Sequence, residues 1–369
     1  MWTKILPVTA LIASVSLTGG TAYAAPATPV GGQALGSHGL VAPEGVKEPP
    51  KTQATSFVIA DVETGDVLAA KDAHGRYLPA STLKTLTALT LIPKLDKNRS
   101  IRPSDNACNQ EGTAVGLSVK TTYKIDDLFR ALMMSSANDA AMALAETNGG
   151  LAKTMRDMNA EAKRLQAYDT VAKTPSGLDK PGQSSSAYDL ALIARAGLAN
   201  PAFRRYISTK TANFPAPEGH YEISNHNKLL WRYKGMIGVK NGWTSKALGS
   251  FVGAANRDGH TIVVSIMRHE GYFWDEVAKL LDWGFSVRGK TQPVGKLVDP
   301  IPDAQAAPRA SAPGSHVTPA AQPPLLDRAA KQSDSTKLIG SVVIGGGLLF
   351  GLIWLGYGIR RRRRGRSRV

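Results

Sequence analysis

The sequence predicts an α+β domain, with an antiparallel sheet built from both ends of the domain and flanked by helices. Strand-like runs lie near residues 56–70 and 248–267, and helical patterns fill the region between them. Strands that bracket a helical middle pair into one sheet, against which the helices can bury their apolar faces. We therefore expect one compact domain at about residues 51–290.

The first two strands are predicted as a hairpin. Residues 56–62 read Ser-Phe-Val-Ile-Ala-Asp-Val, and strand character resumes over residues 67–70. The intervening Glu63-Thr-Gly-Asp66 contains the residue types that favour a turn.

Helices are predicted for the middle of the domain, where apolar residues recur at helical spacing. These segments are residues 81–91, 125–134, 138–146 and 187–198.

A second hairpin and a helix are predicted to close the domain. Residues 248–256 and 261–267 look like strands, and the Asp258-Gly259 pair between them is a strong hairpin signal. Residues 274–283 then form an amphipathic pattern.

The N-terminal segment has the features of an export signal. Lys4 precedes a short apolar run, and Ala22-Tyr-Ala24 resembles a cleavage site, so residues 1–24 are predicted to be a signal peptide. Residues 25–50 are rich in Pro, Gly and Ala and are expected to form a flexible leader.

The C-terminal segment predicts a membrane anchor. Residues 291–336 are expected to be a Pro- and Ala-rich tether, and residues 337–359 a transmembrane helix, because residues 338–359 carry no charge. The arginines within residues 360–369 predict a short cytoplasmic tail. The expected location is the cell membrane, crossed once, with the domain outside the cytoplasm.

The charge and the cysteine content exclude several classes of function. Of the 45 basic residues, nine lie in or beside the two apolar ends, which leaves 36 basic against 29 acidic residues, or +7, for the exported part. Basic and aromatic residues are not interleaved, so no nucleic-acid partner is expected. Cys108 is the single cysteine, which excludes an intramolecular disulfide. The seven histidines show no metal-binding spacing, and no metal or cofactor is expected.

Three short motifs could carry chemistry. In Pro79-Ala-Ser-Thr-Leu-Lys84, Ser81 and Lys84 are three residues apart at a predicted helix start, so an amine lies beside a hydroxyl that needs a base. Ser135-Ser-Ala-Asn-Asp139, between two helices, offers the Ser136 hydroxyl for proton transfer and the Asn138 amide for binding.

The third motif, Val239-Lys-Asn-Gly-Trp-Thr244, is expected at the start of a strand. Lys240 supplies a cation, and Gly242 permits close approach to a substrate. The backbone N–H groups of Trp243 and Ser81 could form an oxyanion hole. Each motif alone is more often a helix cap or a turn, but their order and placement together are specific.

The three motifs and their flanking residues resemble the low-molecular-mass D,D-carboxypeptidases, which are penicillin-binding proteins with a β-lactamase-like fold. The resemblance covers roughly residues 52–287 and includes Pro175-Ser-Gly-Leu178. It implies that Ser81 attacks the bond between two terminal D-alanines of a peptidoglycan stem peptide, with Lys84 as base. Ser136 and Lys240 would pass the proton onward, Asn138 would hold the peptide, and β-lactams would acylate the same serine. Residues 240–244, including Asn241 and Thr244, would line the substrate.

Two positions depart from the family pattern. Asn241 replaces the usual Thr or Ser that contacts the terminal carboxylate of the substrate. Phe273 stands where many relatives carry an arginine, and Arg268 is the available replacement.

Other functions remain open on the sequence alone. A D,D-endopeptidase would share the motifs, and so would a catalytically silent wall-binding protein. A class A β-lactamase is disfavoured because no Glu-x-x-Leu-Asn segment separates the last two motifs. A metal hydrolase is disfavoured by the histidine spacing.

Overall fold

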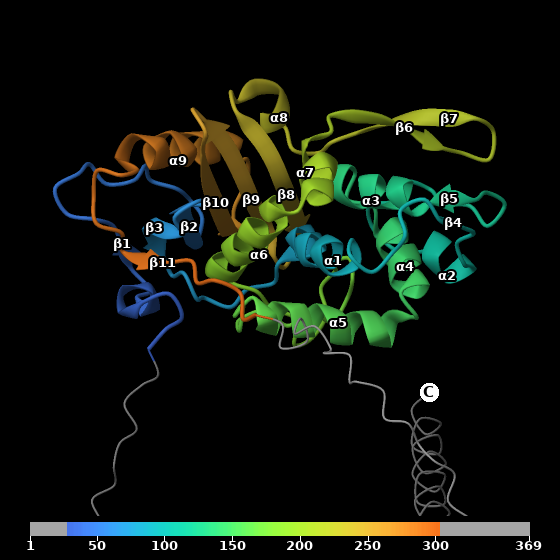
Figure 1. Cartoon of the computed structure of the whole chain (residues 1–369), viewed down its shortest axis with the longest axis horizontal. Coiled ribbons are helices and arrows are strands. Elements are labelled where there is room, and N and C mark those ends of the chain that lie inside the picture. Colours follow the sequence, from blue (N-terminus) through green and yellow to red (C-terminus); the bar gives the residue numbers. More distant parts are fainter. Residues whose placement is uncertain (1–27, 303–369) are drawn as a thin grey trace, which may run out of the picture. The chain divides into compact units, whose positions relative to one another are not determined.

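The computed structural model describes residues 28–302 and confirms the α+β fold (Figure 1). Its main sheet is antiparallel, in the strand order β1-β3-β2-β10-β9-β8, with β11 paired to β3. The strands are β1 (Leu40–Val41), β2 (Ser56–Asp61), β3 (Asp66–Lys71), β8 (Met236–Thr244), β9 (Leu248–Arg257), β10 (His260–His269) and β11 (Gly295–Lys296). The predicted pairing of strands from the two ends of the domain is therefore confirmed.

Both predicted hairpins are present. The β9–β10 turn places Asp258 at φ +52° and Gly259 at φ +80°, which is the left-handed geometry that an Asp-Gly hairpin requires. The β2–β3 turn is tied by a hydrogen bond from the Thr64 N–H to an Asp61 carboxylate oxygen, 2.8 Å long. These local signals set the register of the central strands.

Helices cover both faces of the sheet (Figure 1). One face of β2 contributes Val58 and Ala60 to a core shared with most of the helices, while Phe57 and Ile59 point to the opposite face. The helices on the first side are α1 (Lys84–Leu91), α3 (Ile125–Met134), α4 (Asn138–Thr147), α5 (Leu151–Arg164), α6 (Ala187–Ala199) and α7 (Pro201–Ser208). The second side is covered by α8 (Leu229–Arg232) and α9 (Trp274–Val287).

Several elements were not predicted from the sequence. The largest is α5, which is polar on most of its surface and buries only Thr154, Met158 and Ala162. The smaller ones are η1 (Gln33–Gly36), η2 (Ala80–Leu83), β4 (Ser100–Ile101), α2 (Asp105–Cys108), β5 (Tyr123–Lys124), α7, β6 (Thr211–Pro215), β7 (His220–Ser224) and α8, with β6 and β7 forming a separate hairpin.

The predicted domain limits of 51 and 290 are too narrow. Residues 28–50 were expected to be a flexible leader, yet Leu35 is buried in the core and β1 pairs with β3. Residues 291–302 were expected to begin a tether, yet β11 joins the sheet and Leu297 is buried. A few large apolar residues in these Pro- and Gly-rich segments are sufficient to hold them against the domain.

Within residues 28–302, no helix combines the length and the apolar character that a membrane crossing requires. The predicted signal peptide (1–24), transmembrane helix (337–359) and cytoplasmic tail (360–369) lie outside the described residues.

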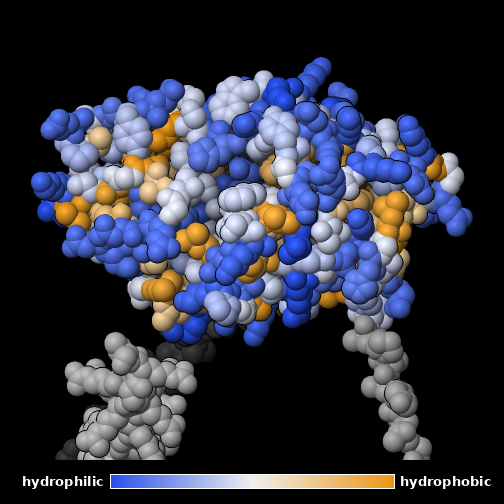
Figure 2. Space-filling model, turned by 180° about the vertical axis from the view of Figure 1, so that it is seen from behind, coloured by the Kyte–Doolittle hydropathy of each residue, from blue (hydrophilic) through white to orange (hydrophobic). Residues whose placement is uncertain are grey.

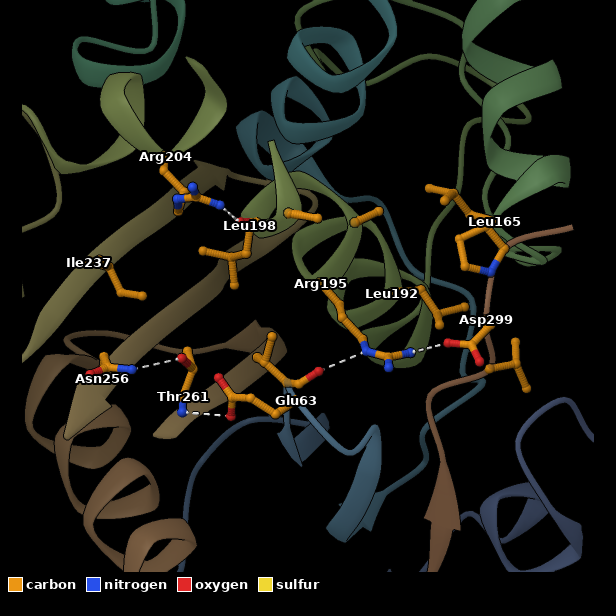
Figure 3. A pocket seen from close by; sticks show the side chains of 15 residues that line it. Glu63, Leu165, Leu192, Arg195, Leu198, Arg204, Ile237, Asn256, Thr261 and Asp299 are labelled. Atoms are coloured by element: carbon orange, nitrogen blue, oxygen red, sulfur yellow. Dashed lines mark hydrogen bonds and ion pairs between the residues drawn. The ribbon is translucent and has the colours of Figure 1, made fainter. Parts of the chain in front are cut away.

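A cavity of about 610 Å³ lies beside the C-terminal end of α6, where β8 begins and β9 ends (Figure 3). Arg195 crosses its wall and donates hydrogen bonds to the carbonyl oxygens of Val62 and Leu297. None of its lining residues belongs to the three motifs, so this cavity is separate from the candidate site. Seen from behind, the domain is mainly hydrophilic, with apolar side chains in small separate patches (Figure 2).

Candidate active site

Ser81 and Lys84 lie side by side, but the element that carries Ser81 differs from the prediction. Ser81 belongs to the short 3₁₀ helix η2, and α1 begins at Lys84. The Lys84 Nζ atom is 3.0 Å from the Ser81 Oγ atom. Ala80, just before the serine, has a left-handed φ of +48°, a strained conformation of the kind often found at functional sites.

Lys84 is fully buried, and its partners suit a neutral amine. Its Nζ atom is 2.7 Å from the Asn138 Oδ1 atom and 2.6 Å from the Ser176 carbonyl oxygen. A neutral amine has two hydrogens and one lone pair. Two carbonyl-type acceptors take both hydrogens, which leaves the lone pair for the O–H of Ser81.

The second motif forms the tight connection between α3 and α4. Ser136 sits there at φ +61°, is almost fully buried, and its hydroxyl has no hydrogen-bond partner among the described residues. Asn138 begins α4, and its Nδ2 atom donates to the Glu111 carbonyl oxygen over 2.6 Å. The Ser136 hydroxyl is therefore free for a substrate, while Asn138 is held in place.

The third motif occupies the second half of β8, not the start of a strand as predicted. Lys240 is buried, and its Nζ atom donates to the Asn241 carbonyl oxygen over 2.7 Å. At Gly242, a Cβ atom would lie only 2.5 Å from the backbone N of Ser81. The glycine thus lets this strand approach the serine closely.

The register of β8 against β9 places the motif residues on two faces of the sheet. Lys240 pairs with Val252 and Gly242 pairs with Ser250, whose hydroxyl donates to Pro79 just before η2. Asn241 pairs instead with Phe251, which belongs to the core under α9. Because alternate residues of a strand face opposite sides, Asn241 and Trp243 are on the α9 face.

The two buried lysines differ in their preferred charge. Burial and the nearby charge of Lys240 lower the pKa of Lys84 well below the ordinary value for lysine. Burial alone lowers the pKa of Lys240 to about 7. Because the charge of Lys240 acts on Lys84, the neutral form of Lys84 is favoured while Lys240 carries its proton.

Three residues near the site were missed from the sequence. Asp139 is buried, and its carboxylate accepts hydrogen bonds from the backbone N–H groups of Val115 and Leu117. These bonds hold the segment at residues 115–117 against the start of α4. Asp179 accepts a 3.0 Å hydrogen bond from the Thr244 hydroxyl. Only their place next to a motif or to Pro175–Leu178 could have singled them out.

His226 is the third missed residue. Its backbone N–H donates to the Met134 carbonyl oxygen over 2.8 Å, which places it beside the second motif. Burial of the ring and the charges of Lys240 and Lys84 lower the pKa of His226 to about 4, so its ring is neutral near pH 7.

Arg268 is not brought to the serine by any contact among the described residues. Its guanidinium lies over the ring of Tyr77, 5.7 Å from the ring centre. Phe273 is buried against Phe251 and Trp274 and covers Gly249 from the α9 side. The structure therefore gives no support to Arg268 as the replacement for a carboxylate-binding arginine.

The arrangement can perform acyl transfer. It offers a serine hydroxyl next to a neutral buried amine, a second hydroxyl with no partner within residues 28–302, a buried lysine, and a strand edge against the serine backbone. These are the parts of an activated nucleophile, a proton path and a peptide-binding edge.

Comparison with known proteins agrees with this chemistry. The sequence profile of the D-alanyl-D-alanine carboxypeptidase family matches residues 44–271. A D-alanyl-D-alanine carboxypeptidase of Mycobacterium tuberculosis is 40% identical over 264 residues, which cover 70% of this chain and 90% of that protein. One from Escherichia coli is 32% identical over 254 residues, 64% of each chain.

Solved structures show the same fold. The crystal structure of a D-alanyl-D-alanine carboxypeptidase from M. tuberculosis matches with a TM-score of 0.67 at 39% identity, covering 69% of this chain and 99% of that one. The Streptomyces K15 DD-transpeptidase matches with a TM-score of 0.62 at 24% identity, covering 65% of this chain and all of that one, which shows the fold alone. The chain therefore belongs to the D-alanyl-D-alanine carboxypeptidase family of serine peptidases.

Proposed function

We propose that the protein removes the terminal D-alanine from peptidoglycan stem peptides through an acyl-enzyme on Ser81. The observation that carries this proposal is the 3.0 Å contact between Ser81 and Lys84, whose two other partners are both hydrogen-bond acceptors.

Acylation begins when Lys84 takes the proton of the Ser81 hydroxyl as Oγ attacks the carbonyl carbon of the penultimate D-alanine. The backbone N–H groups of Ser81 and Trp243 receive the oxyanion. When the C–N bond breaks, Ser136 relays the proton from Lys84 to the leaving nitrogen, and Lys240 stabilises that relay by its charge. Free D-alanine departs, and the shortened peptide stays on Ser81 as an ester.

Deacylation uses the same groups in reverse. A water molecule attacks the ester carbon and gives its proton to Lys84, which returns a proton to the Ser81 oxygen. The products are a peptide shortened by one residue and the free serine. β-Lactams form an ester on the same serine by opening of the lactam ring, and slow attack by water then keeps them on the enzyme.

The outer edge of β8 is the proposed binding surface for the peptide. β8 is the last strand in the sheet order, so an extended peptide can add beside it. Asn138 holds the peptide backbone, and residues 240–244 line it. With no support for Arg268, Lys240 and the amide of Asn241 are the groups proposed to recognise the terminal carboxylate.

Incubation of the purified protein with a pentapeptide ending in D-Ala-D-Ala tests this function. Wild type is expected to release D-alanine, and Ser81→Ala is expected to release none, whereas Ser208→Ala, an exposed serine outside the site, keeps full activity. Absence of release by folded wild type would refute the proposal. Cleavage of a cross-linked peptide dimer into its two monomers, without release of D-alanine from the pentapeptide, would favour the endopeptidase alternative.

We also propose that the protein is exported and crosses the cell membrane once. The support is in the sequence: a signal-like segment at residues 1–24, an uncharged run at residues 338–359 and the arginines that follow it. The full chain is expected in the membrane fraction and a chain ending at residue 302 in the aqueous fraction. Equal partitioning of the two would contradict the anchor.

A further inference from the structure

Trp243 has a large apolar side chain that the fold does not use. It is 66% exposed, the highest value among the large apolar side chains of residues 28–302. The residue paired with it on the neighbouring strand β9 is Gly249, which has no side chain to cover the indole. The residue before it, Gly242, lies against the backbone of Ser81. An open indole therefore stands one residue from the strand position that meets the nucleophile.

The direction of a peptide bound along β8 follows from charge. The attacked carbonyl must lie near Ser81 and hence opposite Gly242. An antiparallel peptide directs its C-terminal carboxylate toward Lys240, whereas a parallel peptide directs it toward Trp243 and away from the lysine. The buried cation therefore favours the antiparallel direction.

Antiparallel pairing then fixes which residue meets Trp243. With the penultimate D-alanine opposite Gly242, the terminal D-alanine is opposite Asn241, and the preceding residue is opposite Trp243. Side chains directly opposite each other in an antiparallel pair share a face of the sheet. The side chain of an L residue before the two D-alanines thus falls on the same face as the exposed indole.

We propose that the Trp243 side chain determines specificity by packing against a long aliphatic side chain on the residue that precedes D-Ala-D-Ala. A lysine-type side chain can lay its methylene stem along the indole and keep its polar end in water. This inference rests on the proposed carboxypeptidase function and adds the substrate residue that the site selects.

Two acylated tripeptides test the inference: diacetyl-L-Lys-D-Ala-D-Ala and acetyl-Gly-D-Ala-D-Ala. Wild type is expected to prefer the lysine peptide by about tenfold in kcat/KM, the scale of discrimination that a few apolar contacts provide. In Trp243→Ala this ratio is expected to fall close to one, and in Trp243→Phe to an intermediate value. The ratio is independent of the fraction of enzyme that folds.

The matched control is Trp231→Ala, because Trp231 is a second exposed tryptophan, 48% exposed, on α8. This variant is expected to keep the wild-type ratio. An unchanged ratio in Trp243→Ala, an equal loss in the Trp231 variant, or a wild type without preference would overturn the inference. Failure of wild type to release D-alanine from either peptide would instead overturn the proposed function.

Discussion

Lys84 differs from an ordinary lysine because every hydrogen of its neutral form is already bonded. Asn138 and the Ser176 carbonyl accept those hydrogens, and the lone pair is left for Ser81. Residue spacing predicted the contact with Ser81, since positions three apart share a helical face. It did not predict the Ser176 contact, because that carbonyl comes from a loop 92 residues away.

Replacing Lys84 by Met is expected to lower the rate of Ser81 acylation by about 10²–10⁴-fold, because the general base is lost while the volume is kept. Labelling with a fluorescent penicillin measures that rate. Lys120→Met is the control, since Lys120 is exposed and away from the site. An acylation rate for Lys84→Met close to that of wild type would show that another group removes the proton.

The pH dependence of kcat/KM follows from the two lysines. Activity needs Lys84 without its proton, so it is expected to rise with pH through the lowered pKa of Lys84. It also needs Lys240 with its proton, so it is expected to fall as pH rises through about 7. The profile should be bell-shaped, with apparent pKa values that belong to the pair. A profile that rises steadily to pH 10 would contradict these assignments.

At the scale of elements, the close approach of β8 to η2 forms the site. A Cβ atom at position 242 would meet the Ser81 backbone N at 2.5 Å, so Gly242→Ala is expected to push the strand and the serine apart. We expect at least a tenfold loss of acylation rate with the fold retained, measured by penicillin labelling and circular dichroism. Gly39→Ala is the control, because its nearest neighbour, the Ser37 Oγ atom, is 3.5 Å away. Equal rates in both variants would exclude the need for this contact.

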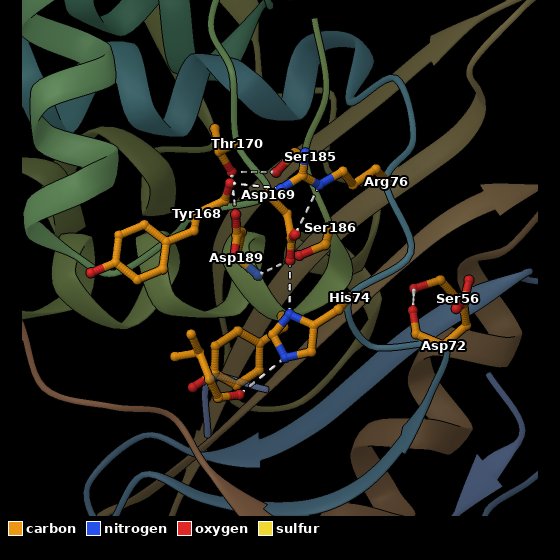
Figure 4. A network of polar contacts seen from close by, with 12 residues as sticks. Ser56, Asp72, His74, Arg76, Tyr168, Asp169, Thr170, Ser185, Ser186 and Asp189 are labelled. Carbon is orange, nitrogen blue, oxygen red and sulfur yellow. Dashed lines mark hydrogen bonds and ion pairs between the residues drawn. The ribbon is translucent and has the colours of Figure 1, made fainter. Parts of the chain in front are cut away.

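A partly buried polar network joins the start of α6 to the segment after β3 (Figure 4). His74 contacts an Asp169 carboxylate oxygen at 2.8 Å and the Val30 carbonyl oxygen at 3.0 Å, and the Thr170 hydroxyl donates to Asp189 over 2.7 Å. Burial raises the pKa of Asp189 to about 7. Burial by itself would lower the pKa of His74, but the hydrogen bond and the charge of Asp169 outweigh it, so the pKa of His74 is raised. Both groups therefore favour the protonated form when folded.

This network predicts a loss of stability as pH rises. A folded pKa above the unfolded value gives stability that is present below the unfolded pKa and is lost as pH rises through the folded one. For Asp189 the window runs from about pH 4 to 7, worth at most about 4 kcal/mol. Asp189→Asn should flatten the fall of the melting temperature across this range. A fall as steep as that of wild type would assign it to other groups.

For the whole molecule, the sequence predicted the fold class, both hairpins and the order of the three motifs, because each rests on local patterns. It misplaced the domain limits, because the buried residues Leu35 and Leu297 lie in Pro- and Gly-rich segments that have few large apolar residues. It also could not show that Arg268 contacts Tyr77, or that Asn241 and Trp243 share the α9 face, since both depend on the register of distant strands.

The corrected N-terminal limit gives a stability prediction. Leu35→Ala is expected to lower the free energy of unfolding by about 2–5 kcal/mol, because its side chain is 1% exposed and packs against Gly295. Leu40→Ala, at a position 44% exposed, should change it by no more than about 0.5 kcal/mol. Denaturant unfolding measures both values. Equal small effects would mean that residues 28–50 do not contribute to the folded domain.

The central claim, that Ser81 forms the acyl-enzyme, is tested most directly by mass spectrometry of the intact protein after brief exposure to benzylpenicillin. We predict a mass increase of one penicilloyl group, located by peptide mapping on the segment that contains Ser81, and no increase in Ser81→Ala. An adduct on any other residue, or an unmodified wild type that is folded, would contradict the account.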